Sequence, residues 1–275
     1  LPDSLLGCAW PVMRLEFGAS VSAAGIISMI VAAGTVFSSL MSDYMIRKLS
    51  TGLVTFFSVA VTAIALFGFS LSHQFWVLCL WAVPYGLGAG AVDAALNNYV
   101  ALHYSSRHMS WLHCFWGIGA CISPYIMGAC LAQNNNWPLG CRSVSLIQVV
   151  ITLVLFLALP LWKKANQAPT LNDAPAAQPV GLLGALRIKG VPYMLLTFFC
   201  YSVAECTTYL WAASYLVEHR GILESTAAEY SSLAYLGITA GRFFSGLIAN
   251  KVGDRNLIRL GGCIMLLGTV MIMLP

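Results

Sequence analysis

Eight runs of about 20 or more predominantly apolar residues are the feature that most constrains this chain. They lie at residues 20–43, 52–72, 75–101, 110–132, 142–162, 190–217, 226–249 and 257–275. An α-helix needs about 20 such residues to cross the hydrocarbon of a bilayer, where every backbone polar group must find its partner inside the protein. The runs therefore predict an all-α protein with eight membrane-spanning helices. The opening residues, LPDSLLGCAWPVM, predict the second half of one more.

The composition agrees with a membrane environment. Only 9% of the residues are charged and 59% are hydrophobic, with a mean hydropathy of +0.79, whereas a soluble domain carries about 25% charged residues. The chain starts without a Met and ends at Pro275 inside an apolar run, so we expect a fragment cut at both ends. The histidines lack metal-ligand spacing and no phosphate-binding loop is visible. We therefore expect no cofactor, no metal, no nucleic-acid partner and no enzyme activity.

The loops between the runs carry an asymmetric charge, which predicts the orientation of the chain. Lys and Arg concentrate on the cytoplasmic side of membrane proteins. If the first partial span runs outward, the inner loops hold Arg47, Lys48, Arg107, Lys163, Lys164, Arg187, Lys189, Lys251, Arg255 and Arg259, and the outer loops hold Arg14, Arg142 and Arg220. We therefore predict a multi-pass protein of the cell membrane. Its cytoplasmic loops would be 44–51, 102–109, 163–189 and 250–256.

One of these loops divides the chain into two parts. Residues 163–189 include KKANQAPTLNDAPAAQPVG, a polar stretch rich in Pro and Ala that is typical of a linker. We predict a first transmembrane bundle at 1–162, the cytoplasmic linker at 163–189, and a second bundle at 190–275.

A repeat supports the division into related halves. The segment GTVFSSLMSDYMIRK begins at Gly34, and the similar segment GRFFSGLIANKVGDR begins at Gly241. The identical pairs are Gly34 with Gly241, Phe37 with Phe244, Ser38 with Ser245, and Leu40 with Leu247. Each copy ends a predicted span and enters a basic inner loop, which favours an internal repeat over chance similarity.

Both copies resemble the loop motif of the major facilitator superfamily, G-x-x-x-D-[RK]-x-G-[RK]-[RK]. The matching positions are Asp43, Arg47 and Lys48 in the first copy, and Gly246, Lys251, Gly253 and Arg255 in the second. In the first copy Ser39 replaces the glycine and Tyr44 and Ile46 depart; in the second Asn250 replaces the acid and Asp254 replaces a base. The resemblance implies twelve helices in two six-helix bundles around a central cavity, with alternating access. This chain would supply the first bundle nearly whole and helices seven to nine of the second.

The motif residues have two explanations. In the first, a latch stabilises one conformation by contacts between helix ends, and its residues would be Asp43, Arg47, Lys48, Gly246, Lys251 and Arg255. In the second, the basic residues simply follow the charge rule for inner loops.

Four ionisable residues lie inside the predicted spans: Asp3, Asp93, Glu205 and Arg242. A charge at the bilayer centre costs roughly 2.5 to 3.5 kcal/mol on insertion scales, so each should face the bundle interior or a wet cavity. Asp3 and Asp93 fall on the first and fourth helices, and symporters of the fucose:proton type are similar in placing coupling carboxylates there. The resemblance implies a proton-coupling role, although the fourth-helix acid of that type is a glutamate. The alternative is that Asp93 makes only structural hydrogen bonds.

Further polar and aromatic residues share helix faces with these acids. Asn97 lies four residues after Asp93, His113 three before Trp116, and Tyr201 four before Glu205. A ring beside a hydrogen-bonding group suits a sugar, so we predict these residues, with Glu205, as cavity contacts. Helix-to-helix hydrogen bonding by His113 stays open, as does a purely structural Glu205–Arg242 pair.

The function that these features favour is secondary active transport. We expect a monomeric, proton-coupled symporter of a small polar solute, expected to be a sugar. A drug:proton antiporter on the same fold is the alternative, and a membrane-embedded enzyme or a non-transporting nutrient sensor is a weaker one.

Overall fold

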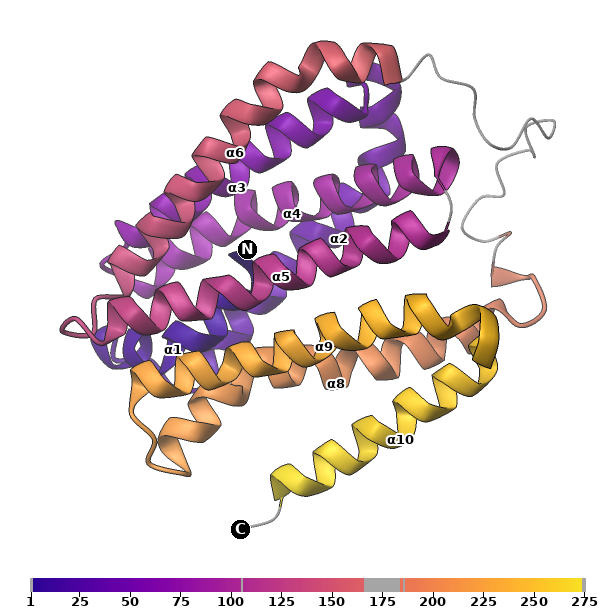
Figure 1. The fold of residues 1–275 in the computed structure, drawn as a ribbon. Helices are drawn as coiled ribbons and strands as arrows, with labels where there is room; N and C mark the ends of the chain where they lie inside the picture. The colour runs from indigo at the N-terminus through magenta and orange to yellow at the C-terminus, as the bar shows by residue number, and fades with distance from the viewer. Residues whose placement is uncertain (1, 105, 166–183, 185, 274–275) are drawn as a thin grey trace.

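The computed structural model describes residues 2–104, 106–165, 184 and 186–273. In these residues the chain forms nine α-helices after one short 3-10 helix, and no strand (Figure 1). The elements are η1 (Pro2–Ser4), α1 (Leu5–Glu16), α2 (Ala23–Leu49), α3 (Thr51–Ser70), α4 (Phe75–His103), α5 (Ser106–Leu131), α6 (Trp137–Ala165), α8 (Val191–Glu218), α9 (Glu224–Val252) and α10 (Asp254–Met273). The predicted all-α class is confirmed.

Each of the eight predicted spans coincides with one long helix, and the partial first span coincides with α1. Six helices of the described chain, namely α2, α3, α4, α5, α6 and α10, are long and apolar enough to cross a membrane. Helices α8 and α9 have comparable lengths of 28 and 29 residues. They carry more polar side chains, among them Glu205 and Arg242.

The helices run farther than the apolar runs do. Helix α2 continues through Arg47 and Lys48 to Leu49, and Ser50, with a φ of 72°, alone separates it from α3. Gly253, with a φ of 81°, separates α9 from α10 in the same way. Lys and Arg are good helix formers and are favourable near a helix C-terminus, so a basic stretch ends a hydrophobic run without ending the helix. Of the predicted linker, residues 166–183 and 185 lie outside the described residues.

Small residues let the first helices approach closely, as is common in membrane proteins. Gly86 and Gly90 of α4 lie against the backbone of α2 at Val31 and Thr35. Thr35 Oγ1 donates to the Gly86 carbonyl oxygen at 3.2 Å, and Ser39 Oγ donates to the Gly90 carbonyl oxygen at 3.2 Å. These bonds join the two helices within the lipid-embedded layer.

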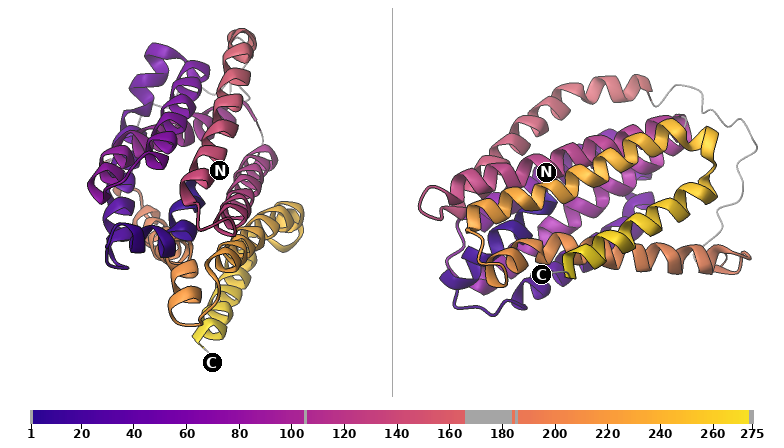
Figure 2. Two further views of the ribbon diagram at one scale, coloured as in Figure 1. Left: turned by 90° about the vertical axis from the view of Figure 1, so that its left-hand side faces the viewer. Right: turned by 60° about the horizontal axis from the view of Figure 1, so that its bottom comes forward.

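Three helix pairs, α5 with α9, α1 with α8 and α1 with α9, join residues before the predicted linker to residues after it. Helix α5 packs along α9, with Gly117 against Thr239 and Gly128 against Ser225. Helix α1 packs on α8, with Gly7 against the backbone of Tyr209. The other views show the α8–α10 group lying beside α1 and α5 (Figure 2).

Helix α1 also contributes to the main hydrophobic core. Trp10 is fully buried, and its Nε1 donates to the Val21 carbonyl oxygen at 2.8 Å. The same core includes Leu66 of α3, Met127 of α5 and Ala213 of α8. The first helix therefore packs against helices from both parts of the chain.

Candidate functional site

Asp3 lies where the N-terminal part of the chain meets α4 and α5. The Tyr85 hydroxyl of α4 donates to Asp3 Oδ1 at 3.0 Å. The Trp116 indole Nε1 of α5 donates to Asp3 Oδ2 at 3.2 Å. Both carboxylate oxygens are therefore held by neutral donors, and no cation is paired with Asp3 within the part of the chain that the structure describes.

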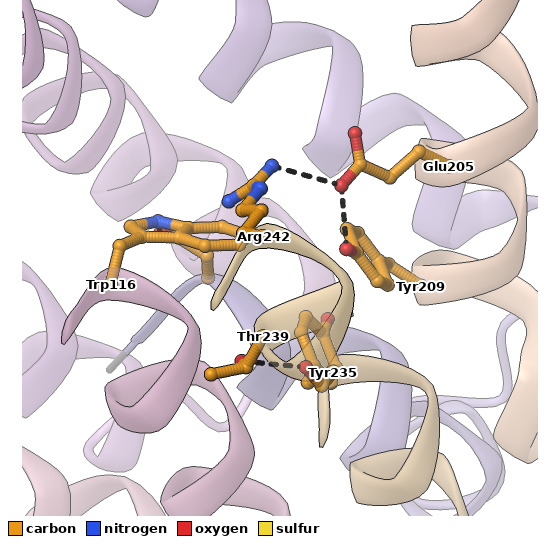
Figure 3. Close-up of polar contacts among 7 residues, drawn as sticks. Trp116, Glu205, Tyr209, Tyr235, Thr239 and Arg242 are labelled. Carbon is orange, nitrogen blue, oxygen red and sulfur yellow. Dashed lines mark hydrogen bonds and ion pairs between the residues drawn. The ribbon is translucent and has the colours of Figure 1, made fainter. Parts of the chain in front are cut away.

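The indole of Trp116 connects this carboxylate to the α8–α9 pair. The Arg242 guanidinium of α9 lies over the Trp116 ring, 4.9 Å from the ring centroid. Arg242 Nη2 lies 3.5 Å from Glu205 Oε1 of α8, and the Tyr209 hydroxyl donates to the same oxygen at 2.7 Å (Figure 3). A continuous polar chain thus runs from Asp3 through Trp116 and Arg242 to Glu205.

Three aromatic rings lie beside this chain. Tyr209 and Tyr235 are stacked with their centroids 4.2 Å apart and an interplanar angle of 12°. The Trp116 ring centroid lies 6.5 Å from each of them. Tyr235 is 2% exposed, and its buried hydroxyl has no hydrogen-bond partner among the described residues. The partly exposed rings of Trp116 and Tyr209 are the kind of surface that a polyhydroxylated molecule can contact.

The close packing of α5 on α9 positions these groups. Gly117 follows Trp116, and its backbone lies against the Thr239 side chain, where a β-carbon would overlap the hydroxyl oxygen. Thr239 Oγ1 donates to the Tyr235 carbonyl oxygen at 2.8 Å, one turn before Arg242 (Figure 3). A glycine at position 117 therefore allows the approach that brings Trp116 to Arg242.

Asp93 and Asn97 lie on one face of α4, one turn apart. Asn97 Nδ2 donates to Asp93 Oδ1 at 3.0 Å, and the side-chain Oδ1 of Asn97 is buried without a partner among the described residues. Asp93 is exposed, and it lies within electrostatic range of His113, Asp3 and Arg242. It makes no hydrogen bond to Asp3 in this arrangement.

The other predicted cavity residues border the same region. His113 interacts electrostatically with both Asp93 and Arg242. Tyr201, one turn before Glu205 on α8, lies close to Glu205 and Arg242. The structure therefore brings together Asp3, Trp116, Glu205 and Arg242 directly, and places Asp93, Asn97, His113 and Tyr201 around them.

The predicted latch residues are more dispersed. Asp43 and Arg47 are exposed near the end of α2, and Lys48 Nζ lies 4.6 Å from the ring centroid of Tyr44 on the same helix. Gly246 lies against Ser110 of α5, while Lys251 and Arg255 are exposed. In the described residues no hydrogen bond or ion pair connects the two motif copies.

Two members of the site were missed in the sequence, although a signal for each was present. Tyr85 precedes Asp93 by eight residues, and Tyr235 precedes Arg242 by seven, which are spacings that place both residues of each pair on one helix face. Tyrosines in apolar runs are common, and only the packing of α4 and α9 against α1 and α5 distinguishes these two.

Comparison with known proteins identifies the family. Residues 1–275 match the family described as Major Facilitator Superfamily. The chain belongs to the Major Facilitator Superfamily. It is 22% identical over 252 residues to the glucose/mannose transporter GlcP of Bacillus subtilis (strain 168), covering 90% of this chain and 62% of that protein.

Two further transport proteins show similar relationships. The hexuronate transporter of Bacillus subtilis (strain 168) is 20% identical over 273 residues, which are 94% of this chain and 64% of that protein. The cis,cis-muconate transport protein of Acinetobacter baylyi (strain ATCC 33305 / BD413 / ADP1) is 21% identical over 269 residues, 91% of this chain and 63% of that protein. The chain thus spans somewhat less than two thirds of the length of these relatives.

Proposed function

We propose that this chain is part of a secondary active transporter that moves a small polar solute, expected to be a sugar, by alternating access coupled to protons. The observation that carries the proposal is the polar chain from Asp3 through Trp116 and Arg242 to Glu205. It places charged side chains, of which Glu205 and Arg242 are partly buried, where helices of the two predicted bundles meet. Charges inside a membrane protein mark solute or proton pathways more often than they stabilise the fold.

The relatives support transport as the general activity. Their names describe carriers of glucose and mannose, of hexuronate, and of cis,cis-muconate, all small polar molecules. In this proposal residues 1–162 form the first bundle and residues 190–275 belong to the second. The loops at 44–51, 102–109, 163–189 and 250–256 face the cytoplasm, and Asp43, Arg47, Lys48, Gly246, Lys251 and Arg255 act as the latch between conformations.

Solute contacts in the proposal come from groups that are not fully used by the protein itself. The side-chain Oδ1 of Asn97 and the hydroxyl of Tyr235 are buried without partners in the described chain, and each would bind a solute hydroxyl once a rearrangement of the helices exposes it. Trp116 presents an indole for stacking. His113, Tyr201 and Glu205 are further candidates at the edge of the same region.

Proton coupling in the proposal depends on Asp3 and Asp93. Neither carboxylate is paired with a cation in the described residues, unlike Glu205. A carboxylate that takes up a proton on the more acidic side loses its charge, and a neutral group costs less than a charge within the membrane. Release on the other side would complete a cycle driven by the pH gradient.

The test uses the full-length protein in right-side-out vesicles with an imposed pH gradient. We expect uphill accumulation of a neutral hexose, and we expect Asp93→Asn to abolish accumulation while solute exchange partly survives. Asn98→Ala, which changes a neighbouring polar residue of the same helix that is outside the proposed site, is the matched control and should accumulate solute normally. Unchanged accumulation by Asp93→Asn would remove the coupling assignment. Transport of a lipophilic cation instead of the hexose would favour the antiporter alternative.

A further inference from the structure

Trp116 makes direct contacts with both Asp3 and Arg242. Its indole N–H is bonded to Asp3, and the face of the same ring holds Arg242. Asp3 lies before α1 in the first predicted bundle, and Arg242 and its partner Glu205 lie in the second. Within the described chain, the hydrogen bond and the ring contact that join this carboxylate to Arg242 therefore belong to one indole.

The two contacts of the indole influence each other. Donation of the N–H to a charged carboxylate pushes electron density onto the ring, as linked polar contacts polarise one another. A guanidinium is attracted to the ring face by that electron density. With Asp3 charged, the Trp116 ring holds Arg242 more strongly; with Asp3 protonated, the attraction weakens and Arg242 is left to Glu205 alone.

We propose that Trp116 is a positioning residue that transmits the protonation state of Asp3 to the Arg242–Glu205 pair, and so couples the two bundles. The inference rests on the proposed transport function. It assigns to Trp116 a role distinct from stacking on a solute. The role depends on the N–H of the indole as well as on its ring.

Other charged and titratable groups face the same elements and must be considered in any pH effect. Around Asp3 these are Tyr85 and Asp93 of α4 and Tyr235 of α9. Around Arg242 they are Glu205 and Tyr201 of α8, His113 of α5 and Asp93 of α4. Because His113 and Asp93 also titrate, a pH effect alone does not identify Trp116, and the test must change the indole chemistry itself.

The decisive variants change the N–H and the ring face separately. In the full-length protein, 3-benzothienylalanine at position 116 keeps the shape and the ring but has no N–H, and a fluorinated tryptophan keeps the N–H but has a poorer ring face. Trp76→Phe is the control, because Trp76 is 71% exposed on α4 and contacts Phe75. All three are compared with wild type by solute exchange without a pH gradient, over a range of pH.

For wild type and the Trp76→Phe control we expect the half-saturation concentration of solute to change at least about fivefold between mildly acidic and mildly alkaline pH. A fivefold change in affinity is the low end of what coupling between two sites produces. Both position-116 analogues should flatten this dependence while still exchanging solute. A role in solute stacking alone predicts weaker binding at every pH with an unchanged profile, and that result would overturn the inference.

A spectroscopic measurement keeps the inference testable even if transport fails. Ultraviolet resonance Raman bands of Trp116, isolated by subtracting the spectrum of Trp116→Phe, report the N–H hydrogen bond and the ring contact separately. We expect Asp3→Asn to alter both sets of bands and to remove their joint response to pH. Ring-contact bands that ignore Asp3→Asn would refute the relay, whereas absence of transport with an intact Raman response would refute only the proposed function.

Discussion

Gly7 is the position where a single added methyl group should disturb both the fold and the site. On Gly7 a β-carbon would overlap the carbonyl oxygen of Tyr209 and lie 3.2 Å from both the Cα and the carbonyl oxygen of Leu210. All three are backbone atoms of α8, so no side-chain rotation relieves the overlap. Helices α1 and α8 must move apart, or the Gly7→Ala chain must adopt another arrangement.

The magnitude follows from two opposing terms. Overpacking a well-packed interior costs typically about 1–3 kcal/mol, and a backbone obstacle argues for the upper end of that range. Replacing a helical glycine by alanine returns up to about 1 kcal/mol through helix propensity. The net loss should be about 2 kcal/mol, which for a chain of this size lowers Tm by roughly 4–8 °C.

The assay is thermal unfolding of the purified protein in detergent, followed by tryptophan fluorescence. Gly25→Ala is the matched control, because no atom lies within 4 Å of the β-carbon that it would add. It gains helix propensity without a clash and should keep or slightly raise Tm. If Gly7→Ala and Gly25→Ala unfold at the same temperature, the tight crossing of α1 and α8 is not part of the stable structure.

Four other substitutions have definite expected outcomes in the same unfolding assay. Glu205→Gln and Arg242→Gln should each destabilise the protein, but their effects should not add. A double-mutant cycle should give a coupling free energy of about 0.5–3 kcal/mol. An additive double mutant would mean that the pair is not formed. Arg14 of α1 pairs with Glu218 of α8, but the Glu218 side chain is 39% exposed. Glu218→Gln should therefore lower the free energy of unfolding by less than about 1 kcal/mol. A much larger loss of stability would contradict a solvent-screened pair. Tyr235→Phe removes a buried hydroxyl without a partner among the described residues. It should leave the free energy of unfolding unchanged or raise it by about 1 kcal/mol, while weakening solute binding. A large destabilisation would show that the hydroxyl is bonded.

The helices themselves could be predicted from the sequence, because the bilayer imposes a length on every span. All eight long helices were found from their apolar runs, including α8 and α9, in which Glu205 and Arg242 interrupt the pattern. Helix ends were less predictable. The charges at Arg47 and Lys48 end the apolar run but prolong α2, since they favour the helix while disfavouring the hydrocarbon.

The candidate site was predictable only in part. A charge in an apolar run is conspicuous, and for that reason Asp3, Asp93, Glu205 and Arg242 stand out from one sequence. Which of them meet depends on how the helices pack. Glu205 and Arg242 are 3.5 Å apart, but the link from Arg242 to Asp3 through Trp116 requires the close crossing of α5 and α9 at Gly117. Long-range crossings of this kind depend on side-chain volumes on both helices at once, and periodicity within one helix does not contain that information.

The packing of α1 on α8 and the central charges are connected through one residue. Tyr209 presents its carbonyl oxygen to Gly7, and its hydroxyl donates to Glu205 at 2.7 Å. In the proposed alternating-access cycle α1 and α8 would belong to different bundles, and any movement of α8 away from α1 would carry the Glu205 end of the polar chain with it. Asp3 and Trp116 precede the predicted linker, whereas Glu205 follows it. The same movement would therefore separate Arg242 either from Trp116 or from Glu205. On this proposal the polar chain would be complete only while α1 and α8 are in contact, and the charge state of Asp3 would favour one arrangement of the bundles over the other.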